Sequence, residues 1–373
     1  MKPFAALILC FALICCSNNS DEPISTTDEE IIQEDNGDTD SEPQQSLYFP
    51  PVGSNDWEIE SPEDIGWNET AITELLTFLE EKNTKAFMIL KDGRIVLENY
   101  FNGGSQFESN PWFSAGKTLT AFVTGMAQDS GYLDLSDATS DYLGEGWTSM
   151  PLTQESAISL KDQITMTTGA DYTVANTNCT LPECLFYLND PGSFWYYHNA
   201  MYTLIQPALN AAIPEGFDTY FEQNLKTTIG MDGAWIDFKF PRVYFSTARS
   251  MARFGLLCLN EGNWDGNQLV SESYFSAMTQ TSQELNSAYG YLWWLNGKDQ
   301  YRLPGSTLEF DGALIPDAPH DLIAGLGAND QKLYVVPSKG LVVIRMGEAA
   351  GEPTGGPSGF DNLLWQKINA VID

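Results

Sequence analysis

Histidine and basic residues are scarce in this 373-residue sequence. It holds two histidines, and 18 lysines and arginines stand against 51 acidic residues, giving a formal net charge of −33 at pH 7. So negative a chain argues against nucleic acid or an anionic membrane surface as a partner. Because histidine is the commonest metal ligand, its shortage leaves metal binding with little support, and we expect neither a metal nor a cofactor.

The chain also lacks a Gly-x-Ser-x-Gly nucleophile elbow, and one of its two histidines, His320, lies in a proline-flanked loop. These absences disfavour a serine hydrolase with a histidine base. The composition is nevertheless that of a globular protein. With 43% hydrophobic residues, the chain can bury a large core as one large domain or two modest ones.

The first apolar run, residues 4–14, is too short to span a bilayer but has the length of a signal-peptide core. It leads into LICCSNNSDE, which resembles a bacterial lipoprotein signal with Leu13 three residues before Cys16. We expect residues 1–16 to be the signal segment, with lipidation of Cys16; a plain signal peptide is the alternative. In either case we expect export. With the lipid anchor, which would be its only contact with a membrane, the protein is expected in the periplasm or at the cell surface.

An acidic segment follows the signal. Between residues 17 and 45 there are ten acidic residues and no lysine or arginine, with no aromatic or periodic apolar pattern. Such a composition predicts a solvated tether over residues 17–46 and a folded domain over residues 47–373.

Cysteine usage agrees with export. Cys179 and Cys184 enclose a short loop in TNCTLPEC, and in an oxidising compartment a disulfide is favoured over two free thiols. Cys258, in the apolar string FGLLCLN, is predicted to be a buried core thiol.

The two ends of the folded part carry the clearest element patterns. NETAITELLTFLEEK predicts a helix capped by Asn68, and KAFMILKDGRIVLENYF predicts two strands joined by a turn at Asp92-Gly93. Near the C-terminus, three strands and a closing helix are predicted from DLIAGLG, QKLYVVP, GLVVIRMG and FDNLLWQKINAVI.

This order predicts an α+β fold. One antiparallel sheet is built from the N- and C-terminal segments, and the terminal helices cover one of its faces. A second, mostly helical lobe is predicted over roughly residues 101–320. The natural place for a catalytic site is the cleft between this lobe and the sheet.

The stretch PWFSAGKTLTAF places Ser114 three residues before Lys117, in the only Ser-x-x-Lys of the chain. A serine hydroxyl needs a base, and a lysine at i+3 shares its helix face. Taken alone, the tetrapeptide favours an ordinary helix start with a solvated lysine. The apolar residues that follow predict a buried helix, which would desolvate the lysine and lower its pKa: Leu119, Phe122, Val123 and Met126.

A second stretch, PGSFWYYHNAMYTLI, carries Tyr197 and Asn199 after a Pro-Gly turn. A tyrosine near the serine can move a proton to the leaving group, and the asparagine can orient a substrate amide or carbonyl. The alternative is the aromatic-rich start of a core helix. His198, between the two, should point away and is not assigned as a base.

These motifs, in the order in which they follow one another along the chain, resemble those of the serine β-lactamase, penicillin-binding and esterase superfamily. The likeness is to the class C-like branch, which includes family VIII carboxylesterases, D-alanyl-D-alanine peptidases and 6-aminohexanoate-dimer hydrolase. It runs from about residue 60 to the C-terminus and includes the blocks SAGKTLTAFVTGMAQDSGYLDLSDATSDYLG, ISLKDQITMTTGADY, STARSMARFGLLCLNEG and YGYLWWLNG. The resemblance implies a β-lactamase/transpeptidase-like fold.

The resemblance also implies roles for individual residues. Ser114 would be the acylated nucleophile, Lys117 its base partner and Tyr197 the general acid/base, with Asn199 lining the site. One oxyanion donor should be the Ser114 backbone N–H at the helix N-terminus, and the other should come from the strand near the third motif.

The third motif departs from the pattern. Relatives carry Lys-Thr-Gly or His-x-Gly there, whereas this chain has AGLGANDQKLYVVP, so the matching residues are 325–327 or 328–330. Without an anion-binding lysine, hydrolysis of an ester or small amide is favoured over that of penicillin. Gly327 and Tyr172 are candidate substrate-binding residues, although glycines here can also serve close strand packing.

Other conspicuous side chains have a structural explanation available. Arg249 and Arg253 lie one turn apart on a helix with Ser246 as its expected cap, and an anchoring role is favoured over substrate binding. Core packing is the default for each large aromatic residue that could instead wall an acyl pocket: Trp112, Trp195, Tyr291, Trp293 and Trp294.

Three hypotheses follow. The preferred one is an exported serine hydrolase that forms an acyl-enzyme and acts on a small-molecule ester or amide. The second is a peptidoglycan D-amino-acid peptidase or weak β-lactamase, and the third is a non-catalytic surface binding protein with the same fold.

Overall fold

The computed structural model of the protein describes residues 47–352 and 355–373. The expectations for the signal segment 1–16, for lipidation of Cys16 and for the tether 17–46 lie outside these residues. The description below concerns the unit Gln45–Asp373.

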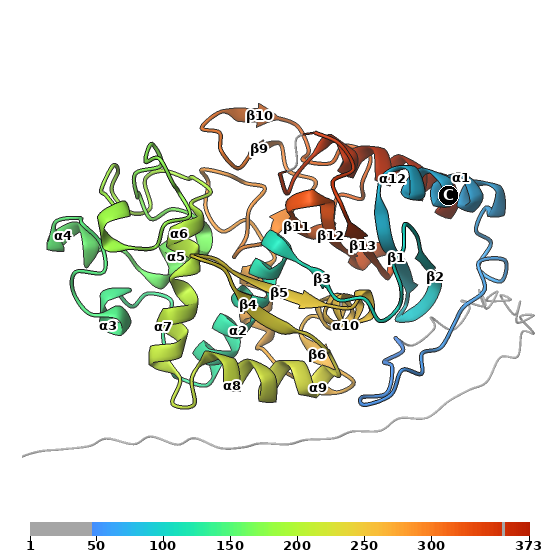
Figure 1. The fold of residues 1–373 in the computed structure, drawn as a ribbon, viewed down its shortest axis with the longest axis horizontal. Helices are drawn as coiled ribbons and strands as arrows, with labels where there is room; N and C mark the ends of the chain where they lie inside the picture. The colour runs from blue at the N-terminus through green and yellow to red at the C-terminus, as the bar shows by residue number, and fades with distance from the viewer. Residues whose placement is uncertain (1–46, 353–354) are drawn as a thin grey trace, which may run out of the picture. The chain divides into compact units, whose positions relative to one another are not determined.

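The main sheet joins the two ends of this unit (Figure 1). Its neighbouring strands are antiparallel throughout, in the order β2, β1, β13, β12, β11 and β8. In that order the strands span Arg94–Tyr100, Thr84–Lys91, Leu341–Gly347, Gln331–Val336, Ile323–Gly327 and Trp294–Leu295. The predicted hairpin is confirmed: Asp92 and Gly93 have φ of 47° and 85° and join β1 to β2 in a two-residue turn.

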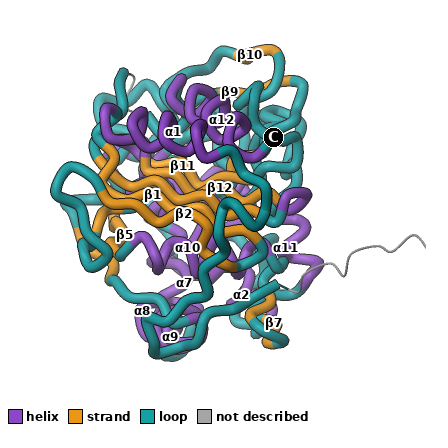
Figure 2. Tube along the Cα trace, turned by 90° about the vertical axis from the view of Figure 1, so that its right-hand side faces the viewer, coloured by secondary structure: helices purple, strands orange, loops and turns teal. Residues whose placement is uncertain are grey.

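Helices cover both faces of this sheet. The terminal helices α1 (Glu69–Glu81) and α12 (Gly359–Ile372) pack side by side on one face, as predicted, and α10 (Ala248–Leu259) lies on the other (Figure 2). The Asn68 side chain caps α1 by accepting a hydrogen bond from the Ala71 N–H. The cap of α10 was predicted wrongly: Thr247 accepts from the Ser250 N–H, while the Ser246 hydroxyl accepts from Trp112 Nε1.

The intervening region, between β2 and β11 in the chain, contains the remaining helices and more β structure than its sequence indicated. A three-stranded sheet has the order β3, β5, β4, and two short hairpins accompany it. These strands are β3 (Asn110–Pro111), β5 (Arg242–Ser246), β4 (Ala234–Asp237), β6 (Asn263–Trp264), β7 (Asn267–Gln268), β9 (Gln300–Arg302) and β10 (Glu309–Asp311). The helices are α2 (Lys117–Asp129), α3 (Ser140–Leu143), α4 (Leu152–Glu155), α5 (Leu160–Thr165), α6 (Asn199–Thr203), α7 (Ile205–Ala212), α8 (Phe217–Phe221), α9 (Thr227–Ile229) and α11 (Glu272–Met278). The predicted α+β class is confirmed.

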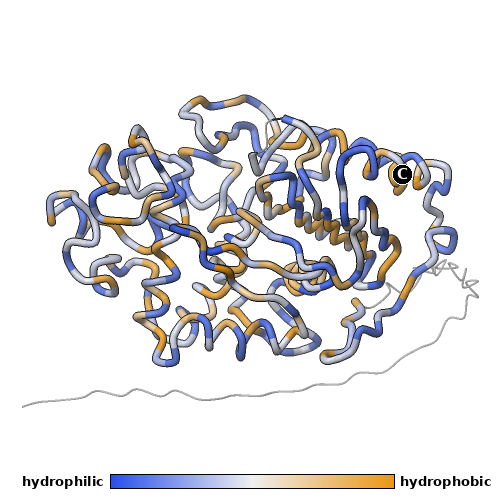
Figure 3. The backbone as a smooth tube through the Cα atoms, in the orientation of Figure 1, coloured by the Kyte–Doolittle hydropathy of each residue, from blue (hydrophilic) through white to orange (hydrophobic). Residues whose placement is uncertain are grey.

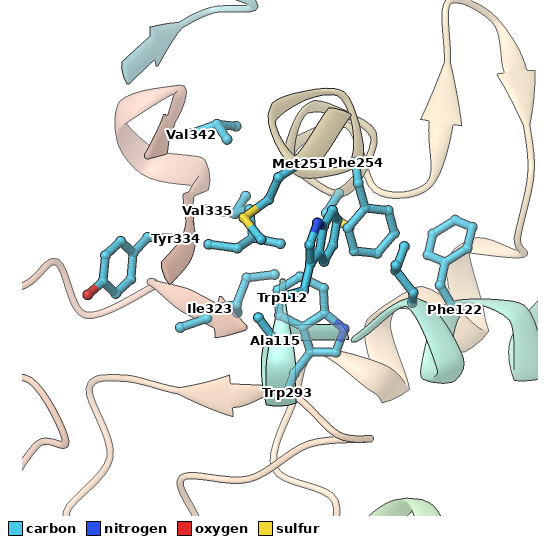
Figure 4. Packing of buried hydrophobic residues seen from close by; sticks show 14 of the residues in the cluster. Trp112, Ala115, Phe122, Met251, Phe254, Trp293, Ile323, Tyr334, Val335 and Val342 are labelled. Carbon is cyan, nitrogen blue, oxygen red and sulfur yellow. The ribbon is translucent and has the colours of Figure 1, made fainter. Parts of the chain in front are cut away.

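The core continues from the main sheet into the intervening region. Figure 3 shows hydrophobic residues along the central strands, and Figure 4 shows Trp112, Phe254 and Trp293 packed between sheet and helices. Helix α2 runs through this core, since every residue from Lys117 to Ala127 is buried. The expectation of a buried helix behind Lys117 is therefore confirmed, and so is the expectation that Cys258 is a buried free thiol.

Across residues 47–352 and 355–373, none of the helices combines the length and apolar character needed to cross a bilayer.

Candidate active site

Ser114 lies in a tight turn that leads into the buried helix. It belongs to the 3₁₀ helix η1 (Phe113–Gly116), which continues directly into α2 at Lys117. Phe113 has a φ of 45°, in the left-handed region that side-chain-bearing residues rarely adopt. Backbone strain of this kind is concentrated at functional sites, where the surrounding packing holds it.

Lys117 places its amine between the serine and the second motif. Its Nζ donates to Ser114 Oγ at 3.0 Å and to Asn199 Oδ1 at 3.1 Å. The side chain is nearly enclosed, since the residue is 3% exposed. Burial disfavours the charged ammonium and lowers the pKa of Lys117 from 10.5 to about 7.

Two tyrosine rings enclose the same amine. Lys117 Nζ lies 4.8 Å from the ring centroid of Tyr197 and 3.9 Å from that of Tyr202. Burial raises the pKa of Tyr197 well above its ordinary value, and a hydrogen bond with the Ser114 side chain opposes that rise. The Tyr197 phenol is therefore neutral at pH 7 and available as a proton donor.

Sequence reasoning missed Tyr202. This residue lies three positions after Asn199 on α6, so helical spacing puts both on one face. Burial raises the pKa of Tyr202 to about 12, which leaves it neutral as well. The i+3 relation to Asn199 is the signal that could have identified it.

Strand β11 brings the third motif against the turn that carries Ser114. A Cβ built on Gly327 would lie 2.3 Å from the Trp112 carbonyl oxygen and 3.2 Å from the Ala115 nitrogen, so only glycine fits this approach. A Cβ on Gly325 would lie 3.1 Å from Thr118 Cγ2. Both glycines of the GLG sequence thus lie against the segment that carries Ser114.

A cavity of about 130 Å³ opens beside these groups. The sequence analysis did not single out most of its wall, because residues far apart in the chain form it. Its lining residues are Phe113, Ser114, Lys117, Asn178, Asn199, Tyr202, Pro241, Arg242, Val243 and Ala328.

The structure places other candidates elsewhere. Tyr172 stacks on Tyr196, with ring centroids 4.4 Å apart, and does not line this cavity. His198 is buried with its Nε2 3.4 Å from the Asp171 carbonyl oxygen, and burial lowers its pKa. Cys179 and Cys184 form a disulfide, next to the cavity residue Asn178.

The two arginines of α10 act as anchors. Arg249 makes an ion pair with Glu98, and Arg253 donates to the backbone carbonyls of Pro50, Pro51, Ser54 and Ile229. Within the part of the chain that the structure describes, no group of three or more His, Cys, Asp or Glu side chains is arranged to hold a metal ion.

The fold is that of the serine β-lactamase and penicillin-binding protein superfamily. A family model described as Beta-lactamase matches residues 79–363, and the chain belongs to the β-lactamase family. Comparison with curated proteins gives no match.

Solved structures with the same fold share little sequence with the chain. One described as a 6-aminohexanoate-dimer hydrolase of Bacillus anthracis has a TM-score of 0.65 at 18% identity, covering 87% of this chain and 89% of that one. A penicillin-binding protein homologue from Caulobacter crescentus has a TM-score of 0.61 at 13% identity, with coverage of 81% and 96%. A class C β-lactamase mutant has 0.60 at 15% identity, also covering 81% and 96%.

Proposed function

We propose that the protein is an exported serine hydrolase that forms an acyl-enzyme on Ser114 and cleaves an ester or a small amide. The observation that carries the proposal is the 3.0 Å contact between Lys117 Nζ and Ser114 Oγ at the cavity wall. A lysine with a pKa of about 7 is about half neutral at pH 7, and the neutral amine can accept the serine proton.

Acylation would begin with attack of Ser114 Oγ on the substrate carbonyl carbon while Lys117 Nζ takes the hydroxyl proton. The Ser114 N–H and the N–H of Ala328, which follows Gly327 at the cavity wall, would stabilise the oxyanion. When the bond to the leaving group breaks, the leaving atom takes a proton from the Tyr197 phenol, and Lys117 passes to the tyrosine the proton that it took from Ser114. Water then attacks the carbonyl carbon of the acyl-enzyme, and the same groups transfer the protons in the reverse order. This step releases the acid and restores Ser114.

The preference for an ester or small amide rests on the third motif. Neither matching stretch, residues 325–327 or 328–330, carries a lysine that could hold a substrate carboxylate. At Gly325 a Cβ would lie 3.1 Å from Thr118 Cγ2, so this position is also closely packed. A carboxylate-bearing peptide or β-lactam would therefore lack the anchor that its recognition needs.

The test compares the purified wild type with Ser114→Ala on p-nitrophenyl acetate, p-nitrophenyl butyrate and nitrocefin, together with labelling by a fluorophosphonate. We expect turnover of the two esters and labelling in the wild type, with both lost in the variant. Ser109→Ala, an exposed serine five residues earlier, is the matched control and should behave as wild type. Equal turnover and labelling in wild type and Ser114→Ala would refute the nucleophile, and turnover of nitrocefin alone would reverse the substrate preference.

A further inference from the structure

The proposed reaction uses no residue of the YGYLWWLNG block, residues 289–297. This segment reverses its direction in a tight turn, where the Gly290 N–H donates to the Trp293 carbonyl oxygen at 2.9 Å. Within the turn Leu292 has a φ of 59°, a left-handed conformation that a side-chain-bearing residue rarely adopts. Such a conformation persists only where the surrounding structure holds it. Just after the turn lies Trp294, whose side chain is buried.

The main sheet fixes the position of Trp294. This residue begins β8, and it pairs with Ala324 of β11. Strand β11 in turn packs against η1, the turn that carries Ser114, with its closest approach at Gly327. A single strand therefore connects the backbone of Trp294 to the backbone around Ser114.

The indole of Trp294 packs on the ring of Tyr197. Their ring centroids lie 5.9 Å apart and the ring planes differ by 18°, a stacked arrangement. Tyr289 meets both rings edge-on, with its centroid 6.2 Å from that of Tyr197 and 4.9 Å from that of Trp294. Stacked and edge-to-face pairs at these separations are favourable arrangements of aromatic rings. Because Tyr197 lies in residues 194–198, which form neither helix nor strand, side-chain packing has to fix its ring.

The position of the Tyr197 hydroxyl depends on this packing. The hydroxyl is at the far end of the side chain and makes a hydrogen bond with the Ser114 side chain. Rotation about χ1 would carry it out of reach of the reacting atoms, since proton transfer requires a heavy-atom separation of about 2.6–3.2 Å. Neither Trp294 nor Tyr289 lines the cavity beside Ser114, so their effect on a substrate there must pass through Tyr197.

We infer that Trp294 is a positioning residue that holds the Tyr197 phenol where it can protonate the departing leaving group. This inference rests on the proposed function and adds a determinant of the leaving groups that the site can release. Activation of Ser114 by Lys117 does not require the Tyr197 proton. Loss of Trp294 should therefore slow the reaction of esters whose leaving group must be protonated, and it should spare esters whose leaving group departs as a stable anion.

The experiment measures kcat/KM of the full-length protein for 4-nitrophenyl butyrate and 4-nitrobenzyl butyrate. Both carry the same acyl group, but the first releases a stable phenolate and the second a basic alkoxide that needs a proton. Trp294→Leu should raise the ratio of the two values, phenyl over benzyl ester, roughly tenfold to hundredfold, the effect expected of a proton donor misplaced by about 1 Å. Fluorophosphonate labelling should persist in this variant, because fluoride departs without a proton, and it shows that the site has folded.

Further variants separate positioning from a general loss of packing. Tyr197→Phe removes the proton donor and should raise the ratio at least as far. The double variant Tyr197→Phe/Trp294→Leu should have the ratio of Tyr197→Phe alone, because Trp294 acts through the tyrosine. Trp293→Leu removes another buried indole one residue earlier, where it packs on Phe254 at 6.2 Å, and should leave the ratio unchanged. Trp294→Phe keeps a ring for stacking and should raise the ratio less than the leucine substitution does.

The possible outcomes distinguish this inference from the proposed function. A ratio that Tyr197→Phe raises and Trp294→Leu leaves unchanged, or one that Trp293→Leu raises as far as Trp294→Leu, would overturn the inference while leaving the hydrolase intact. A ratio unchanged in Tyr197→Phe would remove the proton donor from the proposed reaction and the inference with it. Absence of both labelling and turnover in the wild type would overturn the proposed function and this inference together.

Discussion

At the scale of single residues, the role of base that we propose for Lys117 comes with a cost in stability. Its amine is buried, and among the described residues no carboxylate lies within ion-pair distance of it. Two hydrogen-bonding oxygens and the faces of Tyr197 and Tyr202 are the compensation that the structure provides. The same desolvation that makes the amine a base at neutral pH therefore destabilises the folded protein.

Lys117→Met should abolish fluorophosphonate labelling and stabilise the fold. The lysine pKa is 10.5 when unfolded and about 7 when folded, so the unfolded state binds more protons between these values and wild-type stability rises with pH there. The gain in Tm of the variant over wild type should thus be larger at pH 6.5 than at pH 10, as measured by thermal unfolding. Lys339→Met, at an exposed ion pair, is the control. An equal change at both pH values would contradict the lowered pKa.

Tyr202 should tune the pH dependence of the reaction. With neutral Lys117 as the base, kcat/KM should rise with pH through about 7. The ring face of Tyr202, 3.9 Å from Nζ, favours the ammonium, so Tyr202→Leu should move this apparent pKa down by roughly half to one unit. Tyr202→Phe keeps the ring and should keep the wild-type profile. If the phenylalanine variant shifts as far as the leucine variant, the hydroxyl and not the ring face is responsible.

At the scale of elements, β11 packs against η1, and Ala328, the residue that follows β11, lines the cavity. The turn η4 (Ala328–Asp330) that follows β11 contains two residues with positive φ, Asn329 and Asp330. The Asp330 carboxylate holds this turn by accepting from the Ala350 N–H, the Ser358 hydroxyl and Lys332 Nζ. The position of Ala328 at the cavity thus depends on a buried polar network beneath it.

Gly327→Ala should reduce kcat/KM for p-nitrophenyl butyrate by roughly 10²-fold, the size of effect expected when a reacting group is misplaced by about 1 Å. The added Cβ would lie 2.3 Å from the Trp112 carbonyl oxygen, so the strand must move away from η1. Gly359→Ala, where a Cβ meets nothing within 4 Å, should leave activity unchanged. Full activity of Gly327→Ala would show that the β11 position is not part of the catalytic geometry.

At the scale of the whole molecule, the N-terminal pattern predicts where the protein resides. Cys16→Ser should abolish incorporation of a fatty-acid label and move the protein from the membrane fraction to the soluble fraction, because the lipid would be its only membrane attachment. Turnover of p-nitrophenyl butyrate per molecule should not change, since the proposed catalytic residues belong to the unit Gln45–Asp373. Continued lipid labelling of the variant would refute Cys16 as the modified residue.

Local signals in the sequence predicted the parts of the fold whose cause is itself local. The Asp92-Gly93 turn, the Asn68 cap and the strands of the third motif could be identified because turn chemistry, capping and short-range patterning act over a few residues. The cap of α10 was misplaced by one residue, because Ser246 and Thr247 are both good caps and a tertiary hydrogen bond from Trp112 engages Ser246.

The sequence by itself determined the α+β architecture, the buried helix of Lys117 and the ordered motifs that indicated the family. The tertiary structure alone decided which side chains share the cavity: Tyr202 on the lysine amine, Asn178 next to the Cys179–Cys184 disulfide, and Arg242. It also left Tyr172 in an aromatic stack outside that cavity. The reason is physical: periodicity and capping act between near neighbours in sequence, whereas desolvation and charge pairing depend on contacts between segments that are distant along the chain.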